Sequence, residues 1–160
     1  MANTANEALV RRFYEEVWNE GNVEITEEIF APEYVRHDLR PTRAAPGGAG
    51  MAAIAATFRA AFPDLRMEVD LILSDGDLVA ARWTSTGTFS GPWGDASPTG
   101  VRATFSGVNI FRIRDGLVVE LWNHRDDLGL MEQVGAPVFA GSSHDPEGPT
   151  ADADDGASAR

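Results

Sequence analysis

The chain has 160 residues, a net charge of −12 and no cysteine. This length fits a single domain, and no apolar run reaches the roughly 20 residues that a membrane-spanning helix needs. The lack of cysteine excludes disulfides, thiolate metal ligands and a cysteine nucleophile. All thirteen basic residues are arginine, so a Schiff base on a lysine amine is excluded as well. The acidic charge disfavours nucleic acid and anionic membranes as partners and favours a neutral, largely apolar small molecule.

The two ends of the chain differ from its body. The N-terminal sequence shows no secretory-signal pattern, and a chain without cysteine is compatible with a reducing compartment, so we expect a cytoplasmic protein. Residues 141–160 are polar, acidic and rich in Gly, Pro, Ala and Asp. Such a segment cannot bury a core and is expected to be disordered. The folded domain is therefore predicted to cover residues 1–140.

The first half of the chain has helical periodicity. A first helix is expected from Asn3 to Asn19 and a short second helix from Val23 to Phe30, with Gly21 as a stop signal between them. A short strand is predicted over Glu33 to Asp38. After a Pro/Gly loop at residues 41–50, a third helix is predicted from Met51 to Phe62.

After Pro63 the apolar period changes to two residues, which is typical of strands. The first of these strands is read from the alternating apolar residues Leu65, Met67, Val69, Leu71 and Leu73. Three more are expected at residues 78–89, 101–114 and 117–126, followed by a helical turn at residues 128–134. The pairs Asp75-Gly76 and Asp115-Gly116 are two-residue hairpin signals. Helices followed by an antiparallel meander indicate an α+β fold.

The second hairpin carries most of the chemistry. If Asp115-Gly116 is its turn, Arg114 faces Leu117 and the register of the two strands follows, with paired residues on one face. One face then holds Phe105, Asn109, Phe111, Glu120, Trp122, His124 and Asp126. Because buried polar groups are costly unless paired, this mixture of aromatic and polar side chains favours a ligand pocket. The alternative is that the opposite face, with Val108, Ile110, Val119 and Leu121, is the core.

The order of these segments resembles the SnoaL-like polyketide cyclases of the NTF2-like superfamily. The resemblance is carried by RRFYEEVWNEGN at 11–22, by residues 29–35 followed by His37-Asp38, by TFRAAFPDLRMEV at 57–69, by DLVAARWTSTGTFSG at 77–91 and by DGLVVELWNHRDDLGLMEQVG at 115–135. It implies a cone in which a curved antiparallel β-sheet, wrapped by three helices, encloses a deep pocket. It also implies a cofactor-independent enzyme of natural-product biosynthesis that closes a polyketide ring by an intramolecular aldol reaction. Isomerases, hydroxylases, other cyclases and non-catalytic binding proteins share the fold and stay open as alternatives.

The resemblance also suggests roles for individual residues. The family's acid/base aspartate precedes a Leu-Gly-Leu-Leu-type turn, a position held here by Asp126, with His124 as its partner or as a donor to the reacting carbonyl. A carboxylate in an apolar pocket has a raised pKa, which suits a base. The alternative is that Asp126 or Asp127 caps the terminal helix. Asp38 is the rival base, with His37 beside it at the border of the pocket, although Asp38 could equally close a loop turn.

Further residues complete the expected substrate site. Tyr14 and Trp18 share a helix face, with Trp18 favoured as a core residue and Tyr14 left open as a pocket hydroxyl. Phe105, Asn109 and Trp122 would line the pocket walls, and either Arg82 or Trp83 would enter it. The expected ligand is a hydrophobic polyketide-type molecule.

We expect neither a metal nor a cofactor. His37, His124, Asp38 and Asp126 could form a two-histidine, one-carboxylate set, but they lack a ligand spacing in the sequence. The resemblance further implies a homodimer or larger homo-oligomer that pairs through the outer faces of its sheets. Val108, Ile110, Val119 and Leu121 are the residues expected to need such cover.

Overall fold

The computed structural model describes residues 3–37 and 44–136. The predicted tail at 141–160 and the rival base Asp38 therefore lie outside the described residues. The elements in chain order are α1 (Thr4–Arg12), the π-helix η1 (Phe13–Asn19), the 3₁₀-helix η2 (Val23–Ile25), α2 (Thr26–Ile29), β1 (Phe30–His37), α3 (Gly47–Ala61), β2 (Arg66–Asp75), β3 (Leu78–Thr88), β4 (Arg102–Arg114), β5 (Leu117–Arg125) and α4 (Asp127–Val134). Each predicted helix and strand is present, with ends that differ by a few residues.

The strands form one curved sheet in the order β1-β5-β4-β3-β2. Strands β2 to β5 are an antiparallel meander, as expected from the two hairpin signals. Strand β1 instead pairs in parallel with β5, so the expectation of a purely antiparallel sheet is wrong. The two strands are far apart in the chain, and no hairpin turn forces them to run in opposite directions.

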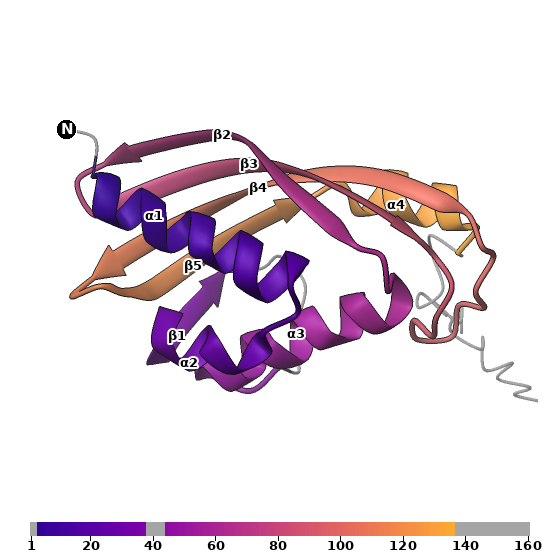
Figure 1. Ribbon diagram of the computed structural model, residues 1–160, viewed down its shortest axis with the longest axis horizontal. Coiled ribbons are helices and arrows are strands. Elements are labelled where there is room, and N and C mark those ends of the chain that lie inside the picture. The colour runs from indigo at the N-terminus through magenta and orange to yellow at the C-terminus, as the bar shows by residue number, and fades with distance from the viewer. Residues whose placement is uncertain (1–2, 38–43, 137–160) are drawn as a thin grey trace, which may run out of the picture.

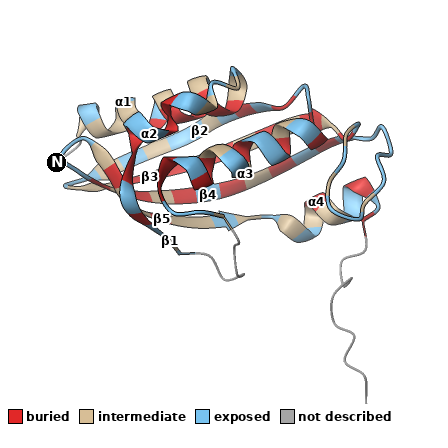
Figure 2. Cartoon of the chain, turned by 90° about the horizontal axis from the view of Figure 1, so that it is seen from below, coloured by how far each residue is buried: buried red, intermediate tan, exposed pale blue. Residues whose placement is uncertain are grey.

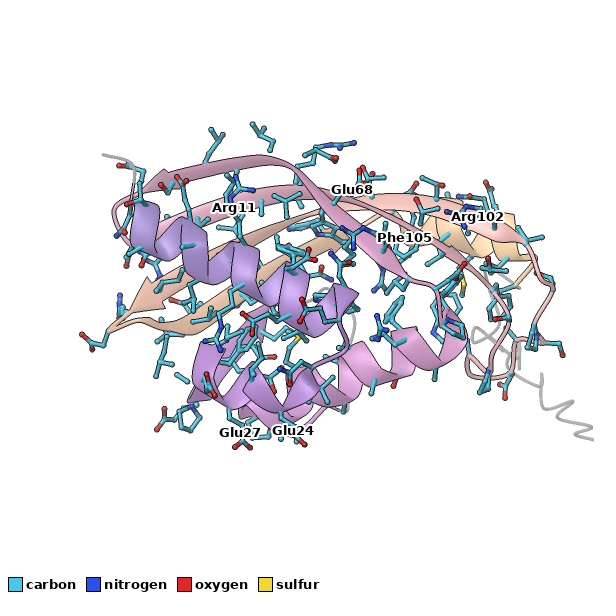
Figure 3. The ribbon with its side chains drawn as sticks, viewed as in Figure 1. Arg11, Glu24, Glu27, Glu68, Arg102 and Phe105 are labelled. Carbon is cyan, nitrogen blue, oxygen red and sulfur yellow. The ribbon has the colours of Figure 1, made fainter. Side chains whose placement is uncertain are left out.

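The sheet arches over the helices, which all lie against one of its sides except for α4 at the end of the sheet (Figure 1). We call the side that faces α1, η1 and α3 the inner face and the opposite side the outer face. Phe105 points from the sheet toward the helices, whereas Glu68 and Arg102 lie on the outer face (Figure 3). The α+β cone expected from the sequence is confirmed.

The core lies between the inner face and the helices, where the buried residues gather (Figure 2). Its largest fully buried side chains include Phe13, Phe30, Phe62 and Phe111. Phe13 is at the centre of an aromatic cluster, with its ring centroid 5.2 Å from that of Phe30 and 5.8 Å from that of Phe111. Phe13 therefore connects η1 to strands β1 and β4.

The second hairpin contains a β-bulge that changes which side chains of β5 face the helices. Asp115 and Gly116 both have positive φ, 51° and 76°, as a type I′ turn requires, and Arg114 pairs with Leu117 as predicted. Beyond the turn the register shifts: Ile113 pairs with Val118, but Arg112 pairs with Glu120. Val119 is the extra residue of a β-bulge, and a one-residue slip moves every later side chain of β5 to the other face. The predicted register is therefore wrong along most of β5.

A second bulge interrupts β2. Val69 pairs with Trp83, whereas Leu71 pairs with Arg82, so that Asp70 is the extra residue. Leu71 and Leu73 consequently lie on the outer face, 51% and 61% exposed. The single apolar face predicted from the alternation in this strand is thus split between the two sides of the sheet.

Within the described ranges, no helix is long and apolar enough to cross a membrane.

Candidate functional site

A pocket lies between the inner face of the sheet and the helices. Together with the open solvent at its mouth, its empty space is about 400 Å³. The residues that line it come from η1, β1, α3 and all four strands of the meander: Phe13, Tyr14, Trp18, Arg36, Met51, Ile54, Phe58, Met67, Trp83, Phe105, Asn109, Leu121, Asn123 and Arg125.

Four of the predicted substrate-binding residues line this pocket: Tyr14, Trp18, Phe105 and Asn109. Trp18 was expected in the core; it is 7% exposed and also contributes to the pocket wall. The π-helical turn places Tyr14 and Trp18 in this wall together, and π-helical turns are frequent at functional sites. Trp83, rather than Arg82, enters the pocket.

The three predicted residues of β5 and its end do not line the pocket. Trp122 and His124 pair opposite Ile110 and Val108 on the outer face, because the bulge at Val119 reverses the strand beyond it. His124 and Asp126 are both exposed. The placement of Trp122, His124 and Asp126 in the cavity is therefore wrong.

Asp126 has a structural role at the start of α4. Its Oδ1 accepts a hydrogen bond from the backbone N–H of Gly129 at 2.9 Å, the geometry of an N-cap. Asp127, the other candidate for the cap, instead accepts a hydrogen bond from Nε of Arg125 at 2.6 Å. The two aspartates divide their work as a cap and an ion-pair partner.

His37 also lies on the outer face, in a cluster with Trp122, Glu120, Arg112 and Asp77. Its ring stacks on that of Trp122 with centroids 4.7 Å apart, and its Nε2 lies 2.9 Å from a carboxylate oxygen of Glu120. Arg112 donates to Glu120 at 2.8 Å and to Asp77 at 2.9 Å. The expectation that His37 binds substrate is not supported by this placement, because its side chain does not contribute to the pocket lining.

The cluster predicts an acid-side loss of stability. The hydrogen bond from His37, followed by that from Arg112, holds the pKa of Glu120 below its ordinary value of 4.5. A lowered folded-state pKa contributes stability above pH 4.5 and loses it as the pH falls through the folded-state value. We expect Glu120→Gln to be less stable than the wild type at pH 6, and the difference to shrink below pH 4.5. Urea denaturation at pH 6 and at pH 3 measures it; a difference independent of pH would contradict the interpretation.

The pocket lining includes two neutral groups, on Tyr14 and Trp18, that can donate a hydrogen bond to a ligand. The Tyr14 hydroxyl and the Trp18 indole nitrogen are buried and have no hydrogen-bond partner among the residues described. Such a group costs about 1–3 kcal/mol when it is left unpaired. Burial raises the pKa of Tyr14 well above 10, so its hydroxyl keeps its proton and can donate. A ligand oxygen in the pocket would satisfy these groups.

Two arginines add positive charge to the lining. The guanidinium of Arg125 lies 4.6 Å from the centroid of the Phe58 ring and is held by Asp127. Arg36 is supplied by β1, and Asn123 stands between Leu121 and Arg125 on β5. Among the lining residues that the structure describes there is no aspartate, glutamate or histidine. The described part of the pocket can therefore stabilise negative charge on oxygen, but it lacks a side chain suited to be a general base.

The sequence reasoning missed Arg36, Asn123 and Arg125. The alternation along β5 predicts that Asn123 and Arg125 share a face. The predicted register, however, put that face on the side opposite to the expected pocket. A bulge leaves no clear signal in this sequence, because Val119 is an ordinary strand residue.

Comparison with known proteins agrees with this architecture. The family model described as SnoaL-like polyketide cyclase matches residues 8–134. A comparison with curated proteins finds no match.

Several solved structures have the same fold. TsrD from Streptomyces laurentii is 28% identical, with a TM-score of 0.76 over 86% of this chain and 99% of that protein. AclR from Streptomyces galilaeus, a proposed hydroxylase, is 29% identical, with a TM-score of 0.73 over 84% of this chain and 83% of that one. IdmH from Streptomyces antibioticus, a proposed polyketide cyclase, is 30% identical, with a TM-score of 0.69 over 82% and 99% of the two chains.

Proposed function

Because this chain belongs to the SnoaL-like polyketide cyclase family, we propose that it closes a ring in a polyketide-type substrate by an intramolecular aldol reaction without a cofactor. The observation that carries the proposal is the pocket, which combines apolar walls with Tyr14, Trp18, Asn109 and two arginines. Apolar walls suit a carbon-rich substrate, and convergent donors suit its carbonyl oxygens.

In this reaction a base removes a proton from a carbon that lies between two carbonyl groups. The carbanion attacks a third carbonyl carbon of the same molecule and forms a carbon–carbon bond. The π electrons of that carbonyl move to its oxygen, which takes up the proton as a hydroxyl, so no atoms are gained or lost. Donors such as the Tyr14 hydroxyl would stabilise the enolate and alkoxide oxygens, and the pocket would hold the chain in a reactive conformation.

The base remains a prediction that mutagenesis must test. Of the two carboxylates considered from the sequence, Asp126 is exposed and caps α4. Asp38 follows Arg36 by two positions in the sequence, and Arg36 lines the pocket. By elimination we assign the proton transfer to Asp38, which makes Asp126 and His124 non-catalytic in this proposal.

A non-catalytic binding protein is the second candidate. It is favoured by one observation: no carboxylate or imidazole lines the described part of the pocket. A binding protein would retain a ligand in the same donor-rich site without converting it.

Turnover separates the two candidates. We expect the purified protein to convert a linear aromatic substrate with three ketone groups into a cyclic isomer of unchanged mass, measured by chromatography with mass spectrometry. Chelator treatment should leave the rate unchanged. A rate no higher than that of heat-denatured protein, across substrates of different chain length, would favour the binding protein.

We also propose that two copies of the chain pair through the outer faces of their sheets. Val35, Leu71, Leu73 and Val108 expose apolar side chains on this face, between 38% and 61% accessible, and burying them against a second copy would favour association. This set differs from the one expected, because Leu121 faces inward and is 1% exposed.

Leu73→Glu should therefore weaken assembly. A charge placed in an apolar interface has to be desolvated on pairing, so we expect the variant to be monomeric at micromolar concentration while the wild type is a dimer or larger. Light scattering measures the mass. Leu128→Glu is the matched control, because Leu128 is 55% exposed on α4 rather than on the sheet. A monomeric wild type would contradict the proposal.

A further inference from the structure

A hydrogen bond between the buried residues Trp83 and Asn109 fixes the orientation of the Asn109 side-chain amide. The two residues lie on the neighbouring strands β3 and β4, 2% and 7% exposed, and both line the pocket. The indole nitrogen of Trp83 is 3.2 Å from Oδ1 of Asn109. An indole N–H can only donate, so the amide must turn its oxygen toward Trp83. The NH₂ group of Asn109 is then left to donate elsewhere.

The position of Trp83 depends on Gly107, which faces it across the β3–β4 ladder. A Cβ atom on Gly107 would lie 2.5 Å from a carbon of the Trp83 ring and 2.6 Å from the carbonyl oxygen of His124. Only glycine therefore leaves room for the ring to lie over β4. The same strand thus supplies both the space for the indole and the amide that the indole holds.

The other neutral donors of the pocket need acceptors as well. The Trp18 indole N–H can only donate, and the Tyr14 hydroxyl keeps its proton. Both polar atoms are buried, and neither has a partner in the described parts of the chain. Tyr14 and Trp18 therefore both need a hydrogen-bond acceptor, and the Asn109 NH₂ group, whose oxygen is engaged by Trp83, is available as a third donor.

We propose that Trp83 is a positioning residue that orients the Asn109 amide, so that its NH₂ group donates to a carbonyl or enolate oxygen of the ligand. A ligand with such an oxygen satisfies this donor, whereas a hydrocarbon of the same shape leaves it unpaired. The inference rests on the pocket of the proposed function but requires only binding. Ring closure could fail while the selectivity remains, so the two proposals fail separately.

The probes are 1,4-naphthoquinone and naphthalene, which share a ring frame and differ in two carbonyl oxygens. The chain has neither cysteine nor lysine, so its side chains offer the quinone no thiol or lysine amine to react with. Isothermal titration calorimetry gives both dissociation constants, and their ratio is the selectivity. We expect the wild type to bind the quinone roughly tenfold or more tightly than naphthalene, as one or two hydrogen bonds provide.

Two single variants test the donors. Tyr14→Phe removes only an unpaired hydroxyl and should keep the fold, and it should lower the selectivity several-fold. Trp83→Phe keeps an aromatic ring but frees the amide to turn, and it should lower the selectivity through weaker quinone binding. The matched controls are Tyr34→Phe and Trp122→Phe, because neither residue belongs to the pocket lining; both should keep the wild-type ratio.

A double variant shows whether Trp83 acts through Asn109. If it does, Trp83→Phe should have no further effect on selectivity once Asn109→Leu has removed the amide, whereas independent effects would add. A merely structural role of Trp83 would change the affinities for both probes and leave their ratio intact. Equal binding of the two probes by the wild type, no quinone binding at millimolar concentration, or an unchanged ratio in Trp83→Phe would overturn the inference.

Discussion

Phe13→Ala is expected to destabilise the domain by about 3–5 kcal/mol, the usual cost of truncating a buried phenylalanine. Phe13 is 1% exposed, and its ring lies within 6.2 Å of the rings of Tyr14, Trp18, Phe30 and Phe111, measured between centroids. The loss is a large fraction of the 5–15 kcal/mol that typically stabilises a folded domain. Thermal unfolding should show a melting temperature about 10 °C lower.

Leu128→Ala is the control for this change. Leu128 is 55% exposed on α4, so its truncation should change the stability by less than about 0.5 kcal/mol. A Phe13→Ala protein as stable as the Leu128→Ala protein would mean that the aromatic cluster does not hold α1 and η1 to the sheet.

Asp38→Asn should slow catalysis strongly, whereas Asp126→Asn should leave it almost unchanged. If Asp38 takes the proton of the substrate, Asp38→Asn should lower kcat by about 10²–10⁴, the range for a positioned general base. Its KM should change little, because the lost interaction acts in the transition state. Asp126→Asn should leave kcat within a factor of about three, since asparagine caps a helix as well as aspartate does and Asp126 lies outside the pocket.

Asparagine is the substitute of choice because it can still cap a helix but cannot act as a base. Asp126→Ala removes both functions and should cost about 1 kcal/mol of stability through the lost N-cap alone, so a slower Asp126→Ala enzyme would not identify a base. Both asparagine variants should first be shown to be folded by circular dichroism. A slow Asp126→Asn enzyme beside a normal Asp38→Asn enzyme would return the role to Asp126. Normal rates in both would remove each carboxylate from the mechanism.

Part of the candidate site could be predicted because it depends on local patterns. Tyr14 and Trp18 are one turn apart on the first helix, and Phe105 and Asn109 alternate along β4, which has no bulge before Arg112. The periods of helices and strands are properties of the backbone itself. The spacing therefore predicted that the two residues of each pair share a face, without any knowledge of the partner strands.

The rest could not be predicted because it depends on pairing. The turn at Asp115 and Gly116 was predicted correctly, yet the extra residue at Val119 turned Leu121, Asn123 and Arg125 to the inner face and Trp122 and His124 to the outer face. The bulge at Asp70 did the same to Leu71 and Leu73. Nothing about valine or aspartate in a strand requires a bulge; the curvature of the sheet over its helices decides where the strands need one.

The sequence by itself determined the α+β class, the order and approximate ends of the helices and strands, and the family. These follow from apolar periodicity, from glycine at turns and from long matching segments, all of which are local along the chain. Only the tertiary structure decided that β1 runs parallel to β5, that Arg36, Trp83, Asn123 and Arg125 enter the pocket, and that His37, His124 and Asp126 stay outside it. The physical reason is that a side chain's face follows from the strand register, and register is set by contacts between segments distant in sequence.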